Sequence, residues 1–440
     1  MQTKEKIYFK TFGCRTNIYD TELLKGYVKD YELTNDEGEA DIVVVNSCTV
    51  TNGADSGVRA YIKALRGKKI ILTGCAAASK GKDLLDKGAI FGVLGAGNKA
   101  QINALLRQGR KFYEINPLDF IDTDIVKRFE NHTKAFVKIQ EGCDYACSYC
   151  IIPSVRGKSR SISEETLIKQ VQILANNGYT EFVLTGTNIG SYGRKDGTSL
   201  GRLLQRLGTV NGVKRIRLGS LEPAQIDESF KEILDEPWIE RHLHIALQHT
   251  SEKMLRLMRR RSHTKDDLAL FELLRGKGYA LGTDFIVAHP GESVEIWEEA
   301  LENFKKFALT HLHGFVFSPR NGTHSATLLA QSQQISGLLA KERLQTLKNI
   351  VAQNNLEFRR EILRAKTSLN VLVESFKDGF YEGYDEFYNK IKIKSAQDLS
   401  KKWLKIDNYE VRENGNFAKF TLLCHQIKHF CKFQAKFTQI

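Results

Sequence analysis

The densest group of potentially reactive side chains is a short run that contains three cysteines. Cys143, Cys147 and Cys150 stand in a CxxxCxxC spacing. Three thiolates on so short a loop can each hold one iron of a cubane iron–sulfur cluster, which leaves the fourth iron without a protein ligand. Tetrahedral zinc is the alternative, but it usually takes four ligands, and the neighbouring sequence offers no obvious fourth cysteine or histidine. The spacing therefore predicts a cluster with one open iron.

Three further cysteines, Cys14, Cys48 and Cys75, each follow a short β-branched run. The carboxyl ends of parallel strands meet at one edge of an open α/β sheet, so residues distant in sequence can gather there around a ligand. The alternative for any one of them is a buried structural thiol, which is common. The chain has 8 cysteines, and in a reducing compartment these favour metal or redox chemistry over disulfides.

The elements that must position the second set of cysteines lie in the first 100 residues. Short β-branched runs at residues 7–9, 42–45 and 70–72 alternate there with polar, helix-like segments. This alternation predicts a small doubly wound α/β domain with a parallel sheet, which we place at residues 1–115.

From about residue 134 the alternation restarts in longer units, which we assign to a domain at residues 130–365. Six strand-and-helix units favour a partial (β/α)6 barrel, and barrel enzymes keep their chemistry at the carboxyl ends of the strands. A polar cluster follows each predicted strand, and each cluster alone could be an ordinary turn, but six in register favour a site. The predicted strands are residues 136–139, 182–184, 215–218, 244–247, 285–287 and 315–317.

Residues 335–365 show the apolar spacing of a helix, and the pattern then changes to short alternating strands. These strands predict a small all-β barrel at residues 367–440. From Lys366 onward there are 13 positive and 9 negative residues, a net charge that suits RNA. Aromatic residues could stack on bases or simply form the core, namely Tyr381, Tyr384, Phe387 and Tyr388. Cys424, His425, His429 and Cys431 invite a zinc interpretation, but their spacings fit no common finger.

Composition limits the class of protein. With 440 residues, 6 prolines and 42% hydrophobic residues, the chain is globular and long enough for two or three domains. A net charge of +13 suits a polyanionic partner such as nucleic acid. We find neither a secretory signal nor about 18 uninterrupted apolar residues. We therefore expect a cytoplasmic protein without membrane contact.

The CxxxCxxC segment resembles the signature of the radical S-adenosylmethionine (SAM) superfamily, whose fold is a partial barrel. The resemblance implies that the open iron chelates the methionine moiety of SAM and that an electron from the cluster splits the sulfonium, giving a 5′-deoxyadenosyl radical. It also implies cofactor contacts at Gly186, Thr187 and Asn188, after the second strand. Glu222 and Gln248 are further candidates, although Glu222 is equally an ordinary loop carboxylate.

Over nearly its whole length the chain is similar to the methylthiotransferases, which join an amino-terminal cluster domain, a radical barrel and a TRAM domain. Residues 46–51, Asn-Ser-Cys-Thr-Val-Thr, resemble a family motif in the form found in the branch that acts on threonylcarbamoyladenosine in tRNA. The likeness implies that Cys14, Cys48 and Cys75 hold a second 4Fe-4S cluster. Its open iron would carry a sulfide or persulfide, and a second SAM molecule would donate the methyl group.

The reaction so implied is methylthiolation of C2 of a modified adenine beside the anticodon. The partners are then the tRNA anticodon stem-loop, a sulfur donor, and a low-potential electron donor such as flavodoxin or ferredoxin. Alternative targets in the same reaction class are isopentenyladenosine in tRNA and an aspartate of a ribosomal protein. A different class is a non-catalytic RNA-binding protein with structural clusters, against which the open CxxxCxxC site argues.

Two loops depart from the family pattern, at residues 248–251 and 288–291, which leaves their cofactor contacts open. Arg156, Lys158 and Arg160 follow the radical loop closely, and we expect them to grip RNA phosphates. The alternative is a solvated basic loop. The run Arg259–Arg261 is predicted to be a charged helix end that could also touch RNA.

Overall fold

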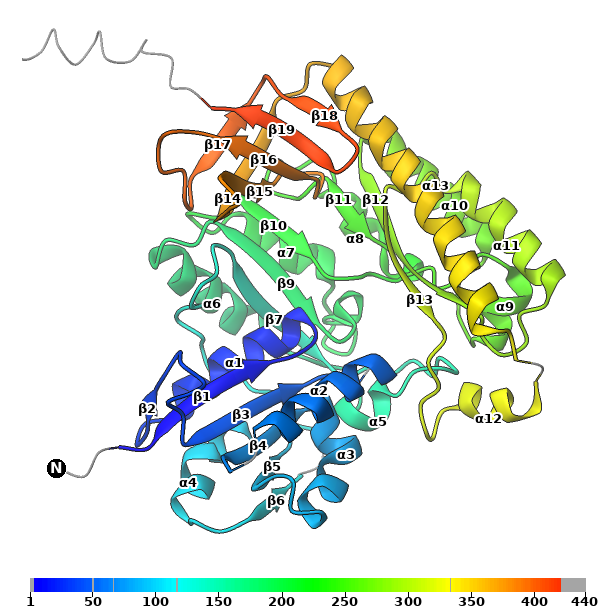
Figure 1. Ribbon diagram of the computed structural model, residues 1–440. Coiled ribbons are helices and arrows are strands. Elements are labelled where there is room, and N and C mark those ends of the chain that lie inside the picture. The colour runs from blue at the N-terminus through cyan, green and yellow to red at the C-terminus, as the bar shows by residue number, and fades with distance from the viewer. Residues whose placement is uncertain (1–3, 50, 66, 116–117, 333, 421–440) are drawn as a thin grey trace, which may run out of the picture. The chain divides into compact units, whose positions relative to one another are not determined.

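The computed structural model describes residues 4–49, 51–65, 67–115, 118–332 and 334–420 (Figure 1). The chain divides into two compact units, Met1–Asn354 and Asn355–Ile440, and each is described by itself. None of the helices in the described ranges combines the length and the apolar composition that a membrane crossing needs.

The first unit opens with a parallel sheet of six strands in the order β2-β1-β3-β4-β5-β6. Its strands are β1 (Lys6–Thr11), β2 (Glu32–Leu33), β3 (Ile42–Ser47), β4 (Lys69–Gly74), β5 (Gly92–Leu94) and β6 (Phe112–Glu114). The helices between them are α1 (Arg15–Tyr27), α2 (Asn52–Ala64), α3 (Cys75–Asp86) and α4 (Ile102–Arg107), the last preceded by the 3-10 turn η1 (Lys99–Gln101).

Helices cover both faces of this sheet. Successive side chains of a strand point to opposite faces, so Val44 packs in one core with Leu24 of α1 and Leu105 of α4. Val43 belongs to the other core, with Val58 of α2. This arrangement confirms the prediction of a doubly wound α/β domain. The sequence could indicate it because a strand that is buried on both faces has a continuous apolar sequence.

The second part of this unit is an incomplete barrel of six parallel strands. β10-β9-β7 form one sheet, which the short antiparallel β8 extends, and β11-β12-β13 form another. Isolated parallel bridges, Ile216 to Ile239 and Leu221 to Ile245, join the two sheets, so the strands follow one another in chain order. Six strands occur in the predicted order, but the fourth lies earlier than the predicted residues 244–247 and shares only His244 with them. The strands are β7 (Ala135–Glu141), β9 (Glu181–Gly186), β10 (Arg215–Leu218), β11 (His242–His244), β12 (Ala280–Val287) and β13 (His311–Val316).

Helices and short turns follow the barrel strands. β8 spans Arg160–Ser161 and the 3-10 turns are η2 (Ile189–Ser191) and η3 (Pro223–Gln225). The helices are α5 (Ile152–Arg156), α6 (Glu164–Asn176), α7 (Leu200–Gly208), α8 (Glu228–Lys231), α9 (Glu252–Leu257), α10 (Thr264–Gly276), α11 (Val294–Lys306), α12 (His324–Gln331) and α13 (Gly337–Arg364).

Helix α7 shows how the sequence builds the barrel core. The Ser199 side chain accepts a hydrogen bond from the backbone N–H of Arg202 and so caps the helix. Leu200, Leu203 and Leu207 recur at helical spacing, and all are buried. The barrel core therefore depends on a leucine stripe that the sequence places on one side of the helix.

The second unit contains a six-stranded sheet in the order β17-β14-β15-β16-β19-β18. Its pairs are antiparallel except for β16 with β19, which fits the predicted all-β, TRAM-like fold. The strands are β14 (Leu369–Lys377), β15 (Phe380–Tyr384), β16 (Lys390–Lys394), β17 (Trp403–Ile406), β18 (Glu410–Arg412) and β19 (Gly415–Lys419). The possible zinc ligands between Cys424 and Cys431 lie outside the described residues.

Replacing Leu207 by alanine should lower the free energy of unfolding by about 2–5 kcal/mol, because it removes a fully buried side chain and leaves a cavity. Urea unfolding followed by fluorescence measures the effect. Leu273→Ala is the matched control, since Leu273 is 43% exposed and should change the same quantity by about 0.5 kcal/mol or less. Equal effects for the two variants would contradict the packing described for α7.

Candidate active site

The three amino-terminal cysteines stand at the carboxyl ends of three neighbouring strands. Cys14 follows β1 by a short turn, Cys48 comes directly after β3, and Cys75 directly after β4. Cys14 is the residue directly before α1, and Cys75 is the first residue of α3. A helix start favours negative charge on these sulfur atoms. The architecture thus brings the predicted residues to one edge of the sheet.

Backbone contacts fix this edge. A Cβ built on Gly13 would lie 2.5 Å from the Cβ of Cys48, so the loops of Cys14 and Cys48 touch. Gly74 has φ of +80°, and a Cβ there would lie 2.4 Å from the Ser47 carbonyl oxygen. Only glycine fits this position. It lets the Cys75 loop approach the end of β3.

The CxxxCxxC loop leaves β7 and ends at α5. The backbone N–H of Tyr145 and the Asn188 side-chain amide each donate to the Cys143 sulfur at 3.5 Å. Arg260 Nη1 lies 3.8 Å from the Cys147 sulfur. N–H groups aimed at cysteine sulfur are the means by which proteins stabilise cluster-bound thiolates.

The loop after β9, whose cofactor contacts stay a prediction, packs against the CxxxCxxC loop. Gly186 ends β9, and Thr187 Oγ1 accepts a hydrogen bond from the backbone N–H of Gly142 at 3.2 Å. The Asn188 side-chain amide donates to the Cys143 sulfur, and its Oδ1 accepts from Gln225 Nε2 at 2.7 Å. This part of the structure therefore holds the segment 186–188 in one conformation beside the cysteines.

Glu222 is held by Arg260, which the sequence pattern assigned to a charged helix end. Arg260 Nη1 donates to Glu222 Oε1 at 2.6 Å, and the Arg260 side chain is only 2% exposed. The run Arg259–Arg261 is therefore not simply a solvated helix end, which corrects that prediction for Arg260. Arg261 instead lies over the ring of Tyr145 at 4.5 Å from its centroid.

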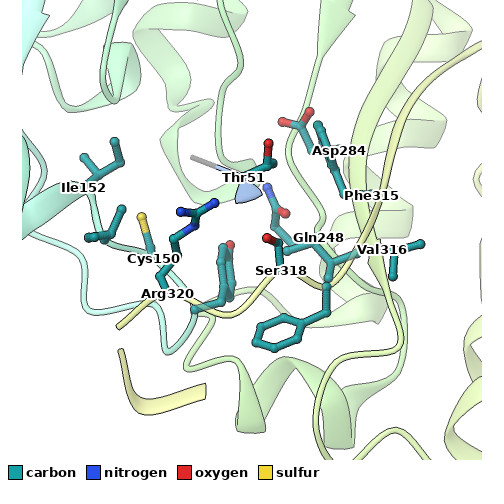
Figure 2. Close-up of a pocket in the computed structure, with 13 residues that line it drawn as sticks. Thr51, Cys150, Ile152, Gln248, Asp284, Phe315, Val316, Ser318 and Arg320 are labelled. Atoms are coloured by element: carbon teal, nitrogen blue, oxygen red, sulfur yellow. The ribbon is translucent and has the colours of Figure 1, made fainter. Parts of the chain in front are cut away.

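A cavity of about 230 Å³ lies at the carboxyl ends of the barrel strands (Figure 2). Cys150 lines it, and so does Gln248, the other predicted cofactor contact. Thr51, three residues after Cys48, lines the same cavity. The cavity thus meets loops of both cysteine sets, and the rest of its wall comes from Tyr149, Ile151, Ile152, Asp284, Ile286, Phe315, Val316, Phe317, Ser318 and Arg320.

One loop departure now has a structural account. His289 Nε2 lies 2.8 Å from Ser325 Oγ, and Ser325 Oγ in turn donates to Ser148 Oγ at 2.8 Å. Burial lowers the pKa of His289 to about 4, so the ring is neutral near pH 7. His289 therefore supports the CxxxCxxC loop through Ser325 instead of standing free in the cavity.

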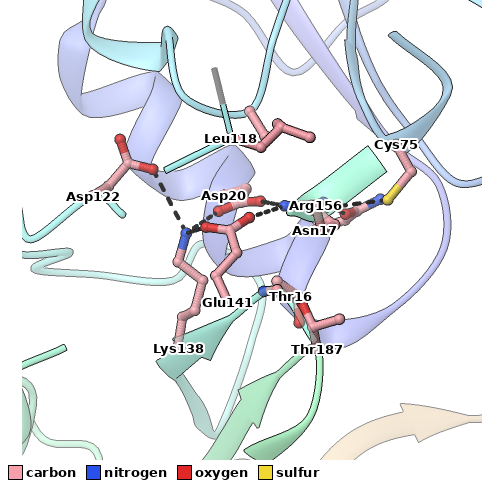
Figure 3. A network of polar contacts seen from close by, with 12 residues as sticks. Thr16, Asn17, Asp20, Cys75, Leu118, Asp122, Lys138, Glu141, Arg156 and Thr187 are labelled. Atoms are coloured by element: carbon pink, nitrogen blue, oxygen red, sulfur yellow. Dashed lines mark hydrogen bonds and ion pairs between the residues drawn. The ribbon is translucent and has the colours of Figure 1, made fainter. Parts of the chain in front are cut away.

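Arg156 contacts the sulfur of one amino-terminal cysteine and carboxylates from both domains of this unit (Figure 3). Its Nε donates to the Cys75 sulfur at 3.2 Å, and its Nη2 donates to Asn17 Oδ1 at 2.9 Å. Its Nη1 donates to Asp20 Oδ2 at 3.0 Å and to Glu141 Oε1 at 2.5 Å. A single guanidinium at the end of α5 thus binds the sheet domain and β7 together.

This placement makes the prediction for Arg156 wrong. Its side chain is 3% exposed and is neutralised by two carboxylates, so it has no free face for an RNA phosphate. Arg160 is half-buried and donates to the carbonyls of Leu118 and Lys158. Lys158 is exposed, and its phosphate contact stays a prediction.

The Arg156 contacts belong to a larger buried cluster of charge. Lys138 lies 2.8 Å from Asp20 and 3.2 Å from Glu141, and Lys99 lies 2.5 Å from Asp122. With Arg156 the cluster contains three cations and three carboxylates, all with side chains 3% exposed or less. Burial alone would raise the pKa of Glu141, but Lys138 and Arg156 hold it at about 2.

Comparison with known proteins identifies the two domains of the first unit. Residues 6–95 match the "Uncharacterized protein family UPF0004", and residues 137–304 match the "Radical SAM superfamily". A "Putative methylthiotransferase" of Helicobacter pylori is 47% identical, over 94% of this chain and 100% of the relative. "Threonylcarbamoyladenosine tRNA methylthiotransferase MtaB" of Aquifex aeolicus is 33% identical, over 88% of this chain and 99% of the relative.

The chain belongs to the methylthiotransferase family of radical SAM proteins. A further relative of this methylthiotransferase is the "tRNA-2-methylthio-N(6)-dimethylallyladenosine synthase" of Fervidobacterium nodosum, 32% identical over 88% of this chain and 92% of the relative. Among solved structures, the radical SAM methyltransferase TsrM of Kitasatospora setae matches with a TM-score of 0.58 and 15% identity, covering 75% of this chain and 78% of that chain. That likeness supports the fold alone.

Radical SAM methylthiotransferases use SAM and two 4Fe-4S clusters, and both cysteine sets fit that use better than zinc. Among the described cysteine, histidine and carboxylate groups, neither set brings its three ligand atoms within 4.8 Å of one another. A tetrahedral zinc ion with bonds of about 2.3 Å would hold its sulfurs about 3.8 Å apart. Neither set is therefore arranged as a ready tetrahedral zinc site, whereas three thiolates can each bind a different iron of a cubane.

The raised pKa values of the buried cysteines disfavour free thiolates at these positions. Burial, with the charge of Cys147 close by, raises the pKa of the Cys150 thiol to about 12. Burial also raises the pKa of the Cys75 thiol, and the positive charge of Arg156 reduces this rise. Such buried thiols lose their protons when a metal binds them.

Replacing Arg156 by methionine should destabilise the protein by about 3–5 kcal/mol at pH 7, because it leaves buried carboxylates without their cation. The variant should also unfold at a higher pH in acid. The folded-state pKa of Glu141 lies below its ordinary value of 4.5, so its stabilising effect is complete above about pH 4.5 and is lost as the pH falls toward 2.

Urea unfolding between pH 3 and pH 7 measures both effects, with Arg156→Lys as the matched control because it keeps the charge. The lysine variant should lie between the wild type and Arg156→Met in stability. If the methionine variant unfolds like the wild type at every pH, Arg156 does not hold the cluster together.

Proposed function

We propose that this protein methylthiolates C2 of N6-threonylcarbamoyladenosine next to the anticodon of tRNA. The observation that carries the proposal is the shared cavity, whose wall includes both Cys150 and Thr51, from the loops of the two cysteine sets. A carbon that must lose hydrogen and gain sulfur has to be within reach of both. Residues 46–51 resemble the form of the motif found in the threonylcarbamoyladenosine branch, and this favours that substrate.

In this proposal the residues of the chain bind and orient the reacting groups. Cys143, Cys147 and Cys150 hold one cluster, and Cys14, Cys48 and Cys75 hold the other. When bound, SAM and the two clusters supply the radical, the sulfur and the methyl group. Asn188 and Arg260 direct N–H groups at the sulfurs of the first set. Glu222 fixes Arg260, so its role is positioning as well as any contact with SAM.

The second unit suits the RNA part of this task. Strand β16 reads Lys-Ile-Lys-Ile-Lys, with Ile391 and Ile393 buried and Lys390, Lys392 and Lys394 on the other face. Tyr384 and Tyr388 stack at 4.9 Å between ring centroids. Glu382 pairs with Lys390 and Lys392, which leaves a positive excess on this face. Positive charge with aromatic rings is suited to phosphate and base contacts, although Phe387 of the predicted aromatic set is buried in the core.

Isopentenyladenosine in tRNA is the second candidate substrate. Relatives named for the two tRNA substrates have nearly equal identity to this chain, so identity does not discriminate between them. An aspartate of a ribosomal protein is the third candidate, and the basic charge of the chain favours RNA over it. A tRNA substrate implies a cytoplasmic enzyme, supplied by a low-potential electron donor and a sulfur donor.

Nucleoside mass spectrometry of tRNA should identify the substrate. Cells that lack this protein should lose 2-methylthio-N6-threonylcarbamoyladenosine and accumulate the form without the methylthio group. The protein expressed from a plasmid should restore the modification, and the same plasmid carrying Cys147→Ala should not. Loss of the isopentenyladenosine derivative instead, or of neither nucleoside, would refute the proposed substrate.

The two cysteine sets should fail in different ways. Cys147→Ala leaves two thiolates for the first cluster, so reduction with SAM should yield no 5′-deoxyadenosine. Cys48→Ala should still cleave SAM but insert no sulfur. Each variant should fall from about eight irons per chain to about four after anaerobic reconstitution.

Liquid chromatography of the products, with iron analysis, measures this difference. Cys424→Ala is the control, because Cys424 belongs to neither set and should leave both products unchanged. Full methylthiolation by Cys48→Ala would eliminate the second cluster from the proposed reaction.

A further inference from the structure

Three neighbouring barrel strands carry an unusual concentration of histidine. β11 and β13 both read His-Leu-His, at residues 242–244 and 311–313, and β12 pairs with both of them. Side chains at alternate positions share a face. In the register, His244 stands beside Gly282, and His313 beside Asp284. One face of this sheet therefore presents four imidazoles and a carboxylate.

Gly282 makes room for these rings. A Cβ at this position would lie 2.8 Å from His244 Nδ1 and 3.0 Å from His242 Nε2. The rings of His244 and His313 pack at 4.4 Å between centroids, and those of His242 and His311 at 4.5 Å. The sheet thus holds the imidazoles close together across a strand that has no side chain at its centre.

Three ligand atoms converge in this group. His244 Nε2 lies 3.1 Å and His313 Nδ1 lies 3.4 Å from the same oxygen, Oδ1 of Asp284. All three atoms lie within 4.8 Å of one another, the one such group among the described histidine, cysteine and carboxylate residues. His244 Nε2 is buried and makes no hydrogen bond, despite its short distance from the carboxylate.

The two N···O distances are compatible with ligand atoms that share one metal ion. An ion with ligand bonds of about 2.1 Å holds neighbouring ligand atoms about 3.0 Å apart in an octahedron and about 3.4 Å apart in a tetrahedron. The two N···O distances, 3.1 and 3.4 Å, lie within this range. Ligand atoms that point at a common ion also lack good hydrogen-bond geometry toward each other, as His244 Nε2 does.

We propose that His244, Asp284 and His313 bind a divalent transition-metal ion, separate from both cysteine sets. Two imidazoles and one carboxylate are ligands that suit Zn²⁺ and Fe²⁺. Three protein ligands leave coordination positions open. Asp284 also lines the cavity that Cys150 and Thr51 line, so the ion lies at the cavity wall and can take an oxygen ligand from its occupant.

The burial of the three ligands fits a site that is both shaped and accessible. His244 has 8% of its side chain exposed and Asp284 has 17%, whereas His313 has 63%. The sheet holds His244 and Asp284 in place, and an ion can enter from solvent at the exposed His313. The alternative is a metal-free group in which Asp284 accepts hydrogen bonds from both rings.

Zinc binding by the reconstituted holoenzyme separates these alternatives. ZnCl₂ alone is the probe, with equilibrium dialysis and elemental analysis of zinc and iron per chain. The wild type should take up one zinc ion per chain with its iron content unchanged. His313→Ala should bind zinc more than about tenfold more weakly. Because His313 is 63% exposed, this substitution should leave the fold intact.

The matched control is His263→Ala, because His263 is 70% exposed and lies 3.5 Å from a carboxylate oxygen of Glu252 but belongs to no such group. It should bind zinc like the wild type. Asp284→Asn provides a second variant of nearly the same shape, which should also weaken binding. Zinc uptake equal in wild type and His313→Ala, or no uptake by the wild type, would overturn the site, and neither result depends on methylthiolation.

Discussion

The buried cluster of three cations and three carboxylates is the interaction on which the first unit depends. Asp20 and Lys99 come from the sheet domain, and Lys138, Glu141 and Arg156 from the barrel. The charges balance, and each group lies within a few ångströms of an opposite one, so their mutual attraction offsets the cost of removing the ions from water. Arg156 then extends the cluster to a cysteine sulfur. The same contacts that join two domains therefore set the position of Cys75 relative to the barrel.

Both domains obey one rule of parallel α/β architecture, which is that ligands gather beyond the carboxyl ends of the strands. In the sheet domain the rule collects three cysteines from three adjacent strands, and in the barrel it collects the CxxxCxxC loop and the segment 186–188. The cavity lies where the two sets of strand ends face each other, since Thr51 and Cys150 both line it. Arg320 reinforces this arrangement, because it reaches from the barrel to Asp55 of α2 at 2.7 Å. The cavity is therefore a property of the joined domains and of neither alone.

The position of the cysteines at the strand ends and the order of the strands could be predicted from sequence. The first depends on local spacing, and the second on a general rule of topology. The roles of Arg156 and Arg260 could not be predicted, because their partners Asp20 and Glu222 lie 136 and 38 residues away and no pattern in the chain marks the pairs. A basic run near a reactive loop looks the same whether it faces solvent or a buried carboxylate. The repeated His-Leu-His of two strands was a visible signal, but its meaning depends on β12 lying between those strands with a glycine at the centre.

The ion cluster also has a consequence for biosynthesis. A ribosome completes the sheet domain before the barrel, so Asp20, Lys99 and Asp122 emerge while Lys138 and Arg156 are still being translated. During that interval two carboxylates face a single lysine, and the surface that will be buried has to stay hydrated. The two domains can dock only after β7 and α5 have left the exit tunnel, because Lys138 and Arg156 then neutralise this charged surface. The order in which the chain is made thus delays closure of the cavity until both sets of cysteines exist.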